Sequence, residues 1–460
     1  MFSISHYTSI SLFFCIISSL SLVLFIKKAM GSYTNIAVFF SFFSMLYGLS
    51  GPINVVWGEG LRPLFSTPYN TDAFLISYAI AKIGLISGFI LFYVISNKDR
   101  YRANEDGLKI VESYKYKLYP ASLILCFMGS LFEIINMFRL GGISVIFKGK
   151  ATYQSMLSSL TLTLPPSEVI VVAFSLIGLY IGINYKRGVE RSRVINKILV
   201  FVLCLVPYIL IKILLGQRGP LVTLFVCLLI GITYFRPIKR IKPKLIFLCV
   251  VFYIFMSFLY ANRGIVNLIP NDPKAFMDIA FTKERLINAL NPGGNEFGAA
   301  FGNYSEFYAK YGHRFDPKLG ETYVKGLIVP IPSFVYPGDK PTQITYEFRD
   351  EFFISEAERG SIAGTALSSI LEAYMNFKNI GVFLVYLMLG YAIQKIERAY
   401  KNRSLLFIFL YVSSIPFAIT FHRSAFGGIF AGIILRAIVI QVLITLYFGS
   451  KKPKVKSVMG

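Results

Sequence analysis

Four arginines stand where the chain leaves or is about to rejoin long apolar runs, namely Arg218, Arg263, Arg359 and Arg423. Arg218 lies in a short Gly-Gln-Arg-Gly-Pro turn, residues 216–220, between two such runs. Arginine stays charged, and its planar fork of N–H donors matches phosphate oxygens. Guanidinium groups that converge at the depth of a lipid headgroup would bind a pyrophosphate. The alternative is that each is an interfacial side chain reaching toward the headgroups for its own solvation.

The sequence lacks the usual signs of metal or nucleotide chemistry. Its three histidines, His6, His313 and His422, are far apart, and no His-Glu-x-x-His motif occurs. There is no Walker A motif and no Gly-x-Ser-x-Gly elbow. Glu59 and Asp72, between the second and third apolar runs, are not the adjacent acidic pair of a metal-dependent lipid-phosphate glycosyltransferase. We therefore predict a site without a metal ion or a cofactor.

The elements that must position these arginines are membrane-spanning helices. The chain has 460 residues, of which 55% are hydrophobic and 15% charged, and its mean hydropathy is +0.61. A bilayer core needs about 20 mostly apolar residues per helix. The predicted fold is an all-α, polytopic transmembrane helical bundle of about 11 spans. These are 8–26, 35–56, 73–96, 118–138, 166–184, 197–215, 219–235, 245–260, 380–394, 404–421 and 425–448.

Basic residues alternate between the loops. One set of loops, with the C-terminal tail, carries 26 of them, whereas the short loops of the opposite set carry six. The positive-inside rule makes the first set cytoplasmic, with the N-terminus outside and the C-terminus inside. The net charge of +23 is therefore read as a topology signal of a protein in a lipid bilayer, and no nucleic-acid partner is expected.

A polar insert divides the chain into three parts. Residues 1–260 hold the first eight spans, 261–363 form a large outer loop, and 364–460 hold a re-entry segment and the last three spans. The insert contains 13 of the 24 carboxylates. Asn-Asp-Pro at 271–273 predicts the start of an amphipathic helix that continues to about Leu290.

Aromatic residues follow this helix, among them Tyr304 and Tyr308. Their rings can stack on sugar faces, although aromatic residues are also common at membrane interfaces. Four charged residues lie inside predicted spans, Lys82, Glu133, Lys212 and Arg436. Intramembrane charges are costly and often functional. A structural pairing of Glu133 with Lys82 or Arg436 is the alternative that we weigh equally.

Three local patterns lie along this layout: the 216–220 turn, the acidic-aromatic segment 346–352, and small residues with Glu-x-Tyr-x-Asn-Phe within 364–381. By layout and patterns, the chain resembles the oligosaccharide repeat-unit polymerases of bacterial surface polysaccharide assembly, the Wzy-type O-antigen polymerases. One position departs from the family, because Lys378 stands where glycine is common after Asn-Phe.

The resemblance implies an activity. Such enzymes transfer a growing glycan from an undecaprenyl diphosphate carrier to a new lipid-linked repeat unit, on the periplasmic face of the bacterial inner membrane. The lipid diphosphate is the leaving group, so neither nucleotide sugar nor metal ion is needed. The expected partners are undecaprenyl-diphosphate-linked glycans as donor and acceptor; a chain-length regulator stays an open question.

The resemblance also assigns expected roles to residues. Cationic groups would stabilise the charge that develops on the leaving group, and a base would accept the proton of the acceptor hydroxyl. His422, Glu372 and Glu358 are alternative bases. The catalytic candidates are Arg218, Arg359, His422, Arg423 and Glu372, and the substrate-binding candidates are Arg263, Tyr304, Tyr308 and Arg349.

Two alternatives remain at the level of sequence. An O-antigen ligase would use the same donor with a lipid A-core acceptor, and the sequence discriminates poorly between the two enzymes. A lipid-linked oligosaccharide flippase would belong to another class. A flippase should show related halves and no dominant outer insert, and we find no such halves.

Overall fold

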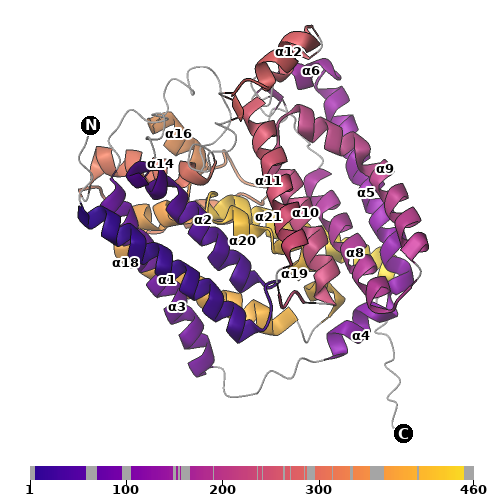
Figure 1. Cartoon of the computed structure of the whole chain (residues 1–460), viewed down its shortest axis with the longest axis horizontal. Coiled ribbons are helices and arrows are strands. Elements are labelled where there is room, and N and C mark those ends of the chain that lie inside the picture. Colours follow the sequence, from indigo (N-terminus) through magenta and orange to yellow (C-terminus); the bar gives the residue numbers. More distant parts are fainter. Residues whose placement is uncertain are drawn as a thin grey trace.

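Helices make up every regular element that the structure, a computed structural model, describes (Figure 1). No strand occurs within that part of the chain, which agrees with the predicted all-α class. The described residues are 6–57, 70–95, 105–148, 152–153, 156, 166–189, 191–235, 237–240, 242–262, 265–269, 271–283, 285–286, 296–312, 314–331, 335–352, 367–400 and 404–449.

A first helix group shares one core. It comprises α1 (His6–Met30), α2 (Ile36–Trp57), α3 (Thr71–Ile95), α14 (Glu296–Tyr311) and α18 (Ser369–Tyr400). Helices α3 and α18 approach each other closely because glycines face each other. A β-carbon at Gly88 would lie 2.1 Å from the Leu387 carbonyl oxygen, and one at Gly390 would lie 2.3 Å from that of Leu85. Such small-residue contacts are typical of helix packing in membranes.

A second helix group has a separate core around α8. It comprises α5 (Lys115–Arg139), α8 (Pro166–Lys186), α9 (Arg191–Leu214), α10 (Arg218–Tyr234), α19 (Leu405–Ser414) and α21 (Phe426–Leu443). Helix α8 begins at Pro166, a residue that suits the first helical turn. Gly178 of α8 and Gly231 of α10 pack backbone against backbone.

The two groups meet at a broken segment near the C-terminus. The predicted span 404–421 is interrupted after α19, and a short helix α20 (Phe417–Thr420) and a turn precede α21. Ile415 and Ile419 pack into the second group's core, whereas Ala418 and Ala425 pack into the first group's core. The turn that carries His422 and Arg423 is therefore held from both sides.

Each predicted span overlaps a described helix, although α18 is longer than the predicted span 380–394. Eight helices are long and apolar enough to cross a membrane by length and composition: α1, α2, α3, α5, α8, α9, α18 and α21 with its continuation Ile444–Phe448. Three shorter apolar helices fall on the remaining predicted spans, namely α10, α11 (Pro243–Asn262) and α19.

The polar insert contributes further helices. Besides α14 and the short η1 (Val266–Leu268), they are α12 (Pro273–Ala280), α15 (Glu321–Ile328) and α16 (Ile344–Phe352). The predicted start of α12 is confirmed, because the Asp272 side chain accepts a hydrogen bond from the Ala275 N–H at 2.9 Å. The predicted extent is wrong: α12 ends at Ala280, with Phe281 as its C-cap.

These insert helices gather toward one end of the molecule. In Figure 1, α12, α14 and α16 lie at this end together with α6 (Ser144–Phe147), which lies between the predicted spans 118–138 and 166–184. Helix α4 (Glu105–Ser113), from a loop predicted to be cytoplasmic, lies at the opposite end.

The charges inside the spans pair differently from the prediction. Glu133 accepts a hydrogen bond from Lys212 at 2.6 Å, and the Tyr153 hydroxyl donates to the same oxygen at 3.1 Å. Lys82 instead donates to the Cys15 carbonyl at 3.2 Å. The predicted pairing of Glu133 with Lys82 or Arg436 is therefore wrong, because α9 rather than α3 or α21 lies beside Glu133.

Candidate active site

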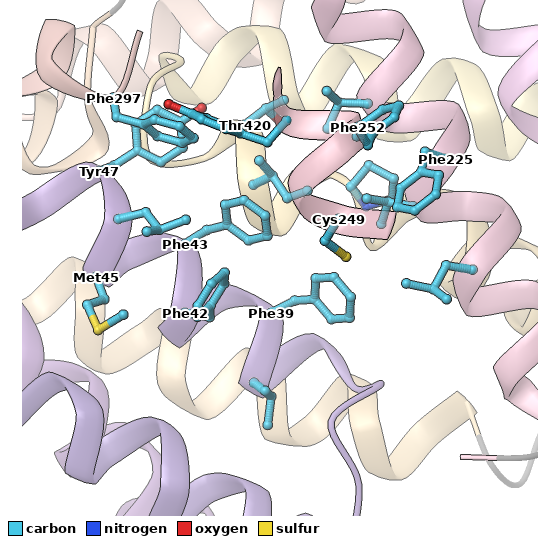
Figure 2. Close-up of a pocket in the computed structure, with 18 of the residues that line it drawn as sticks. Phe39, Phe42, Phe43, Met45, Tyr47, Phe225, Cys249, Phe252, Phe297 and Thr420 are labelled. Carbon is cyan, nitrogen blue, oxygen red and sulfur yellow. The ribbon is translucent and has the colours of Figure 1, made fainter. Parts of the chain in front are cut away.

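A large apolar cavity separates α1 and α2 from α10 and α11. Its volume is about 690 Å³, and aromatic and aliphatic side chains form most of its wall. Figure 2 shows Phe39, Phe42 and Phe43 of α2 across this space from Phe225 and Phe252. The last two rings stack with their centroids 4.5 Å apart and so join α10 to α11. The cavity lies where the two helix groups meet.

Arg423 is the one charged side chain among the described residues that line this apolar cavity. A β-carbon at Gly219 would lie 3.8 Å from Nη2 of Arg423. The structure thus brings together two segments 200 residues apart, the 216–220 turn and the turn before α21. Arg218 is the first residue of α10, and its side chain lies outside the described set. The free N–H groups and dipole of a helix N-terminus favour anions, which adds to the positive charge of Arg423.

His422, beside Arg423, turns away into the core. It is 4% exposed, and its ring lies 4.5 Å from that of Phe40. The ring Nε2 lies 3.0 Å from the Phe40 carbonyl oxygen and must donate its proton there, because a carbonyl only accepts. Burial lowers the pKa of His422 to about 3, so the imidazole is neutral near pH 7. His422 therefore anchors the turn to α2, while Nδ1 stays unprotonated.

Glu372 is buried at a joint between three helices. It is 1% exposed. Its Oε1 accepts a hydrogen bond from the Thr322 hydroxyl of α15 at 3.0 Å, and its Oε2 accepts one from the Phe426 N–H at 2.8 Å. Phe426 begins α21, so the carboxylate satisfies a free N–H at a helix N-terminus. Glu372 does not line the apolar cavity or the second cavity described below. Its hydrogen bonds join α18 to α15 and α21.

The rest of the Glu-x-Tyr-x-Asn-Phe pattern strengthens this joint. The Asn376 side chain donates to Thr322 Oγ1 at 2.6 Å and accepts from the Gly320 N–H at 2.9 Å. Helix α18 is broken directly after it, at Phe377 and Lys378. Lys378 has φ 55° and ψ −150°, a conformation that is essentially confined to glycine. The backbone at position 378 thus favours glycine, which is the residue that is common there in the family, although this chain has lysine.

A second, polar cavity of about 290 Å³ lies between the start of α8, α10 and α21. Its wall includes the ion pair between Glu168 Oε2 and the Nε of Arg436. Arg436 is fixed further by the Ser413 carbonyl, which accepts from Nη1, and by the Phe417 ring, whose centroid lies 4.0 Å from its guanidinium carbon. Five residues with hydroxyl groups also line it, Ser167, Tyr208, Thr223, Thr420 and Ser424, together with Val171, Pro220, Phe417, Gly428 and Ile429.

The two cavities adjoin. Thr223 and Thr420 line both, while Arg423 lines the apolar cavity and its neighbour Ser424 the polar one. Sequence reasoning did not find Glu168. One signal for it was present in the sequence, because Glu168 is a carboxylate two residues after Pro166, at the predicted start of a span. The partner of Glu168, Arg436, lies 268 residues away in the sequence. This junction can place a phosphate-bearing lipid beside a hydroxyl-bearing ligand.

The remaining predicted site residues lie elsewhere. The Tyr304 ring is 1% exposed and packs 5.3 Å from the rings of Phe74 and Tyr374, while its hydroxyl meets Ser77 at 2.7 Å. This burial gives no support to sugar stacking by Tyr304, because both ring faces are covered.

Tyr308 is half-buried and lies nearly parallel to Tyr304, with centroids 6.2 Å apart. Arg349, on α16, donates to Asp350 at 2.7 Å. Neither residue lines the two cavities. Arg263, Glu358 and Arg359 lie outside the described residues, so their predicted roles stay predictions. Among the described residues, no cluster of three or more His, Cys, Asp or Glu could hold a metal ion.

The helices and the site define an integral membrane protein with an apolar cavity that has a cationic group in its wall. Residues 341–454 match the family model of the O-antigen polysaccharide polymerase Wzy. This match confirms the resemblance to Wzy-type polymerases over the segment that holds α18 to α21, including Glu372, His422 and Arg423. Neither a curated protein nor a solved structure matches the chain.

Proposed function

We propose that this protein polymerises undecaprenyl-diphosphate-linked oligosaccharide repeat units into O-antigen or a related surface polysaccharide. The reaction is a metal-independent glycosyl transfer on the periplasmic face of the inner membrane. The observation that carries the proposal is the position of Arg423. It is the single charged lining residue, among those described, of a large apolar cavity, and it lies in the segment that matches the polymerase family.

The cavity suits a carrier lipid because its wall can solvate a long isoprenoid chain. Along α2 alone, the lining residues from Val38 to Tyr47 cover about 14 Å at the helical rise of 1.5 Å per residue. A lipid tail in this space would put its diphosphate beside Arg423 and the first turn of α10. Guanidinium N–H donors bind phosphate oxygens with good geometry and charge.

This arrangement would assist the departure of the carrier. In the transfer, a hydroxyl oxygen of the acceptor bonds to the anomeric carbon of the donor glycan, and the hydroxyl proton is released to a base or to water. The bond from that carbon to the carrier diphosphate breaks, and its electron pair leaves with the diphosphate. Arg423 and the α10 N-terminus would stabilise the negative charge gained there, which is a large contribution to catalysis when the donors are preorganised.

The direct experiment is a reconstituted reaction. Purified protein in lipid nanodiscs receives undecaprenyl-diphosphate-linked repeat units with a chelator present, and the products are separated by chain length. We expect a ladder of longer lipid-linked glycans. Unchanged repeat units, or elongation that needs a divalent metal ion, would contradict the proposal.

A deletion strain separates the related activities. A polymerase deletion leaves lipid A-core capped by single repeats, whereas a ligase deletion leaves bare core with polymer retained on the carrier lipid. A flippase deletion would leave repeat units on the cytoplasmic face. We expect the first profile.

A further inference from the structure

The polar cavity has the chemical character of a carbohydrate site. Its described lining includes a carboxylate, a guanidinium group and five hydroxyl groups, from Ser167, Tyr208, Thr223, Thr420 and Ser424. Sugars present many hydroxyl groups, which both donate and accept hydrogen bonds. A wall that combines an acceptor-only carboxylate with hydroxyl groups can satisfy both roles. The volume of about 290 Å³ is small enough to hold a terminal sugar rather than a long glycan.

Two polar groups in this wall are poised for a ligand. Glu168 uses Oε2 in its ion pair with Arg436, and Oε1 has no hydrogen-bond partner among the described residues. The Thr420 hydroxyl oxygen is buried and likewise lacks a partner within the described chain. A buried hydroxyl without a partner costs free energy, so such a group calls for an explanation. A hydroxyl-bearing ligand in the cavity would supply the missing hydrogen bond to Glu168, and a rotation of the Thr420 side chain would bring its hydroxyl to the same ligand.

The ion pair is built to hold Glu168 in place. Arg436 is 4% exposed and is bound to a backbone carbonyl and to an aromatic face besides the carboxylate. Its position in α21 therefore fixes the carboxylate that projects from the start of α8. Buried ion pairs contribute little to stability by themselves, so a role in orientation accounts for this pair better.

We propose that the polar cavity binds the terminal sugar of the acceptor glycan, and that Glu168 orients it by accepting a hydrogen bond from the attacking hydroxyl. The inference rests on the proposed function, since it places the acceptor next to the donor diphosphate. The two proposed sites are neighbours because the cavities share part of their wall. Thr223 and Thr420 line both cavities, so a sugar in the polar cavity would lie directly beside the anion site at Arg423.

The test measures acceptor binding separately from donor binding. The probe is the reducing oligosaccharide of one repeat unit, released by mild acid from the lipid-linked oligosaccharide that accumulates in a deletion strain. It lacks a diphosphate and cannot act as a donor. Its affinity for nanodisc-embedded protein is measured by saturation-transfer NMR and by inhibition of elongation. Binding of undecaprenyl diphosphate without a glycan is measured in parallel.

We expect Glu168→Gln to weaken probe binding about tenfold or more, because a charged acceptor is lost. Thr420→Val should weaken it about threefold to tenfold, because one neutral hydrogen bond is lost. Binding of undecaprenyl diphosphate should change by less than about twofold in Glu168→Gln, since Glu168 does not line the apolar cavity.

The matched control is Glu112→Gln. Glu112 also forms ion pairs, with Lys186 at 3.2 Å and Arg187 at 3.4 Å, but at the opposite end of α8. This variant should bind the probe as the unaltered protein does.

Probe affinities of Glu168→Gln and Thr420→Val that both stay within about twofold of the unaltered protein would overturn the inference, as would absence of probe binding to the unaltered protein. Should Glu168→Gln fail to accumulate, the Thr420→Val result decides by itself. If undecaprenyl diphosphate does not bind while the probe does, the proposed function fails and the sugar site stands.

Discussion

At the scale of single residues, the two cationic side chains of the C-terminal segment have different surroundings. Arg436 is bound by Glu168, Ser413 and Phe417. Arg423 lines the large apolar cavity beside Gly219. A β-carbon at Gly219 would lie 3.8 Å from Nη2 of Arg423, which is an ordinary contact distance, so the two turns are neighbours. Because Arg423, unlike Arg436, lines the apolar cavity, it is the residue that we expect to meet the phosphate of a lipid.

Replacing Arg423 tests that expectation. Arg423→Ala should lower the rate of polymer formation by about 100-fold or more, the usual loss when one group that stabilises developing negative charge is removed. Arg423→Lys should retain part of the rate, because the charge remains while the planar fork is lost. The measurement is the chain-length profile of surface polysaccharide at matched protein levels. Arg187→Ala is the control. Arg187 directly follows the C-terminal end of α8 and lines neither cavity, so this variant should give normal chains.

Glu372 is expected to act on stability. In Glu372→Gln, the amide oxygen can still accept from the Phe426 N–H, but the amide NH₂ would then face Thr322, and the Thr322 hydroxyl proton would lose its buried acceptor. This should lower the free energy of unfolding by about 1–3 kcal/mol, which is measured as a lower Tm in detergent. Activity per folded molecule should stay within a few-fold.

The control for this variant is Glu321→Gln, on α15. The Glu321 carboxylate is 52% exposed and pairs with Lys325 of the same helix. Its loss should leave the Tm nearly unchanged. A large loss of activity per folded Glu372→Gln molecule would instead restore a catalytic role for Glu372.

Sequence reasoning identified some of these residues and missed others, and each outcome has a physical reason. Arg423 was visible because a charge at the end of an apolar run stands out against its neighbours. Glu168 was not, because its meaning depends on Arg436, which is distant in sequence. Tyr304 was assigned to sugar stacking because aromatic type alone does not reveal burial. Its contacts with Phe74 and Tyr374 arise only when α14 packs against α3 and α18.

At the scale of elements, the positions of the apolar helices were predictable, whereas their breaks were not. Hydropathy averages over about a turn or more, so it located the apolar helices but merged α19 with α20. The start of α12 was visible in its capping residues. Its end was not, because the apolar spacing continued beyond Ala280.

The break in α18 can be tested at Lys378. Lys378→Gly should raise the free energy of unfolding by about 1 kcal/mol, because the strained conformation costs a lysine about 1–3 kcal/mol and glycine adopts it freely. The measurement is thermal unfolding of the purified protein. Lys378→Ala is the matched control. It removes the ammonium group but keeps the β-carbon, and it should bring no such gain. Equal Tm values for the two variants would contradict the argument from backbone strain.

At the scale of the whole molecule, two cores face each other across the apolar cavity. One is built around α3 and α18, and the other around α8. The chain crosses between them several times, and the turn at 421–425 is in contact with both. The candidate site therefore depends on how the two helix groups are joined, which a local sequence pattern does not reveal.

The orientation of the molecule in the membrane can be tested with reporters. Alkaline phosphatase fused after Pro337, in the insert, should be active, because it would be exported to the periplasm. The same enzyme fused after Gly188, between α8 and α9, should be inactive, because the basic loop there is predicted to stay in the cytoplasm. A fluorescent protein that folds only in the cytoplasm should report the reverse. The opposite pattern would place the polar insert in the cytoplasm and would contradict the proposed reaction on the periplasmic face.

The apolar cavity would contact the part of the donor that glycosyl transfer leaves unchanged. After the glycan has moved, the spent carrier would keep every tail contact and would present a freed terminal phosphate to Arg423. An enzyme that holds its product as firmly as its donor is slowed by product release. Added undecaprenyl diphosphate should therefore inhibit elongation strongly and compete with the donor, so that carrier recycling in the membrane would govern how fast polymer is made.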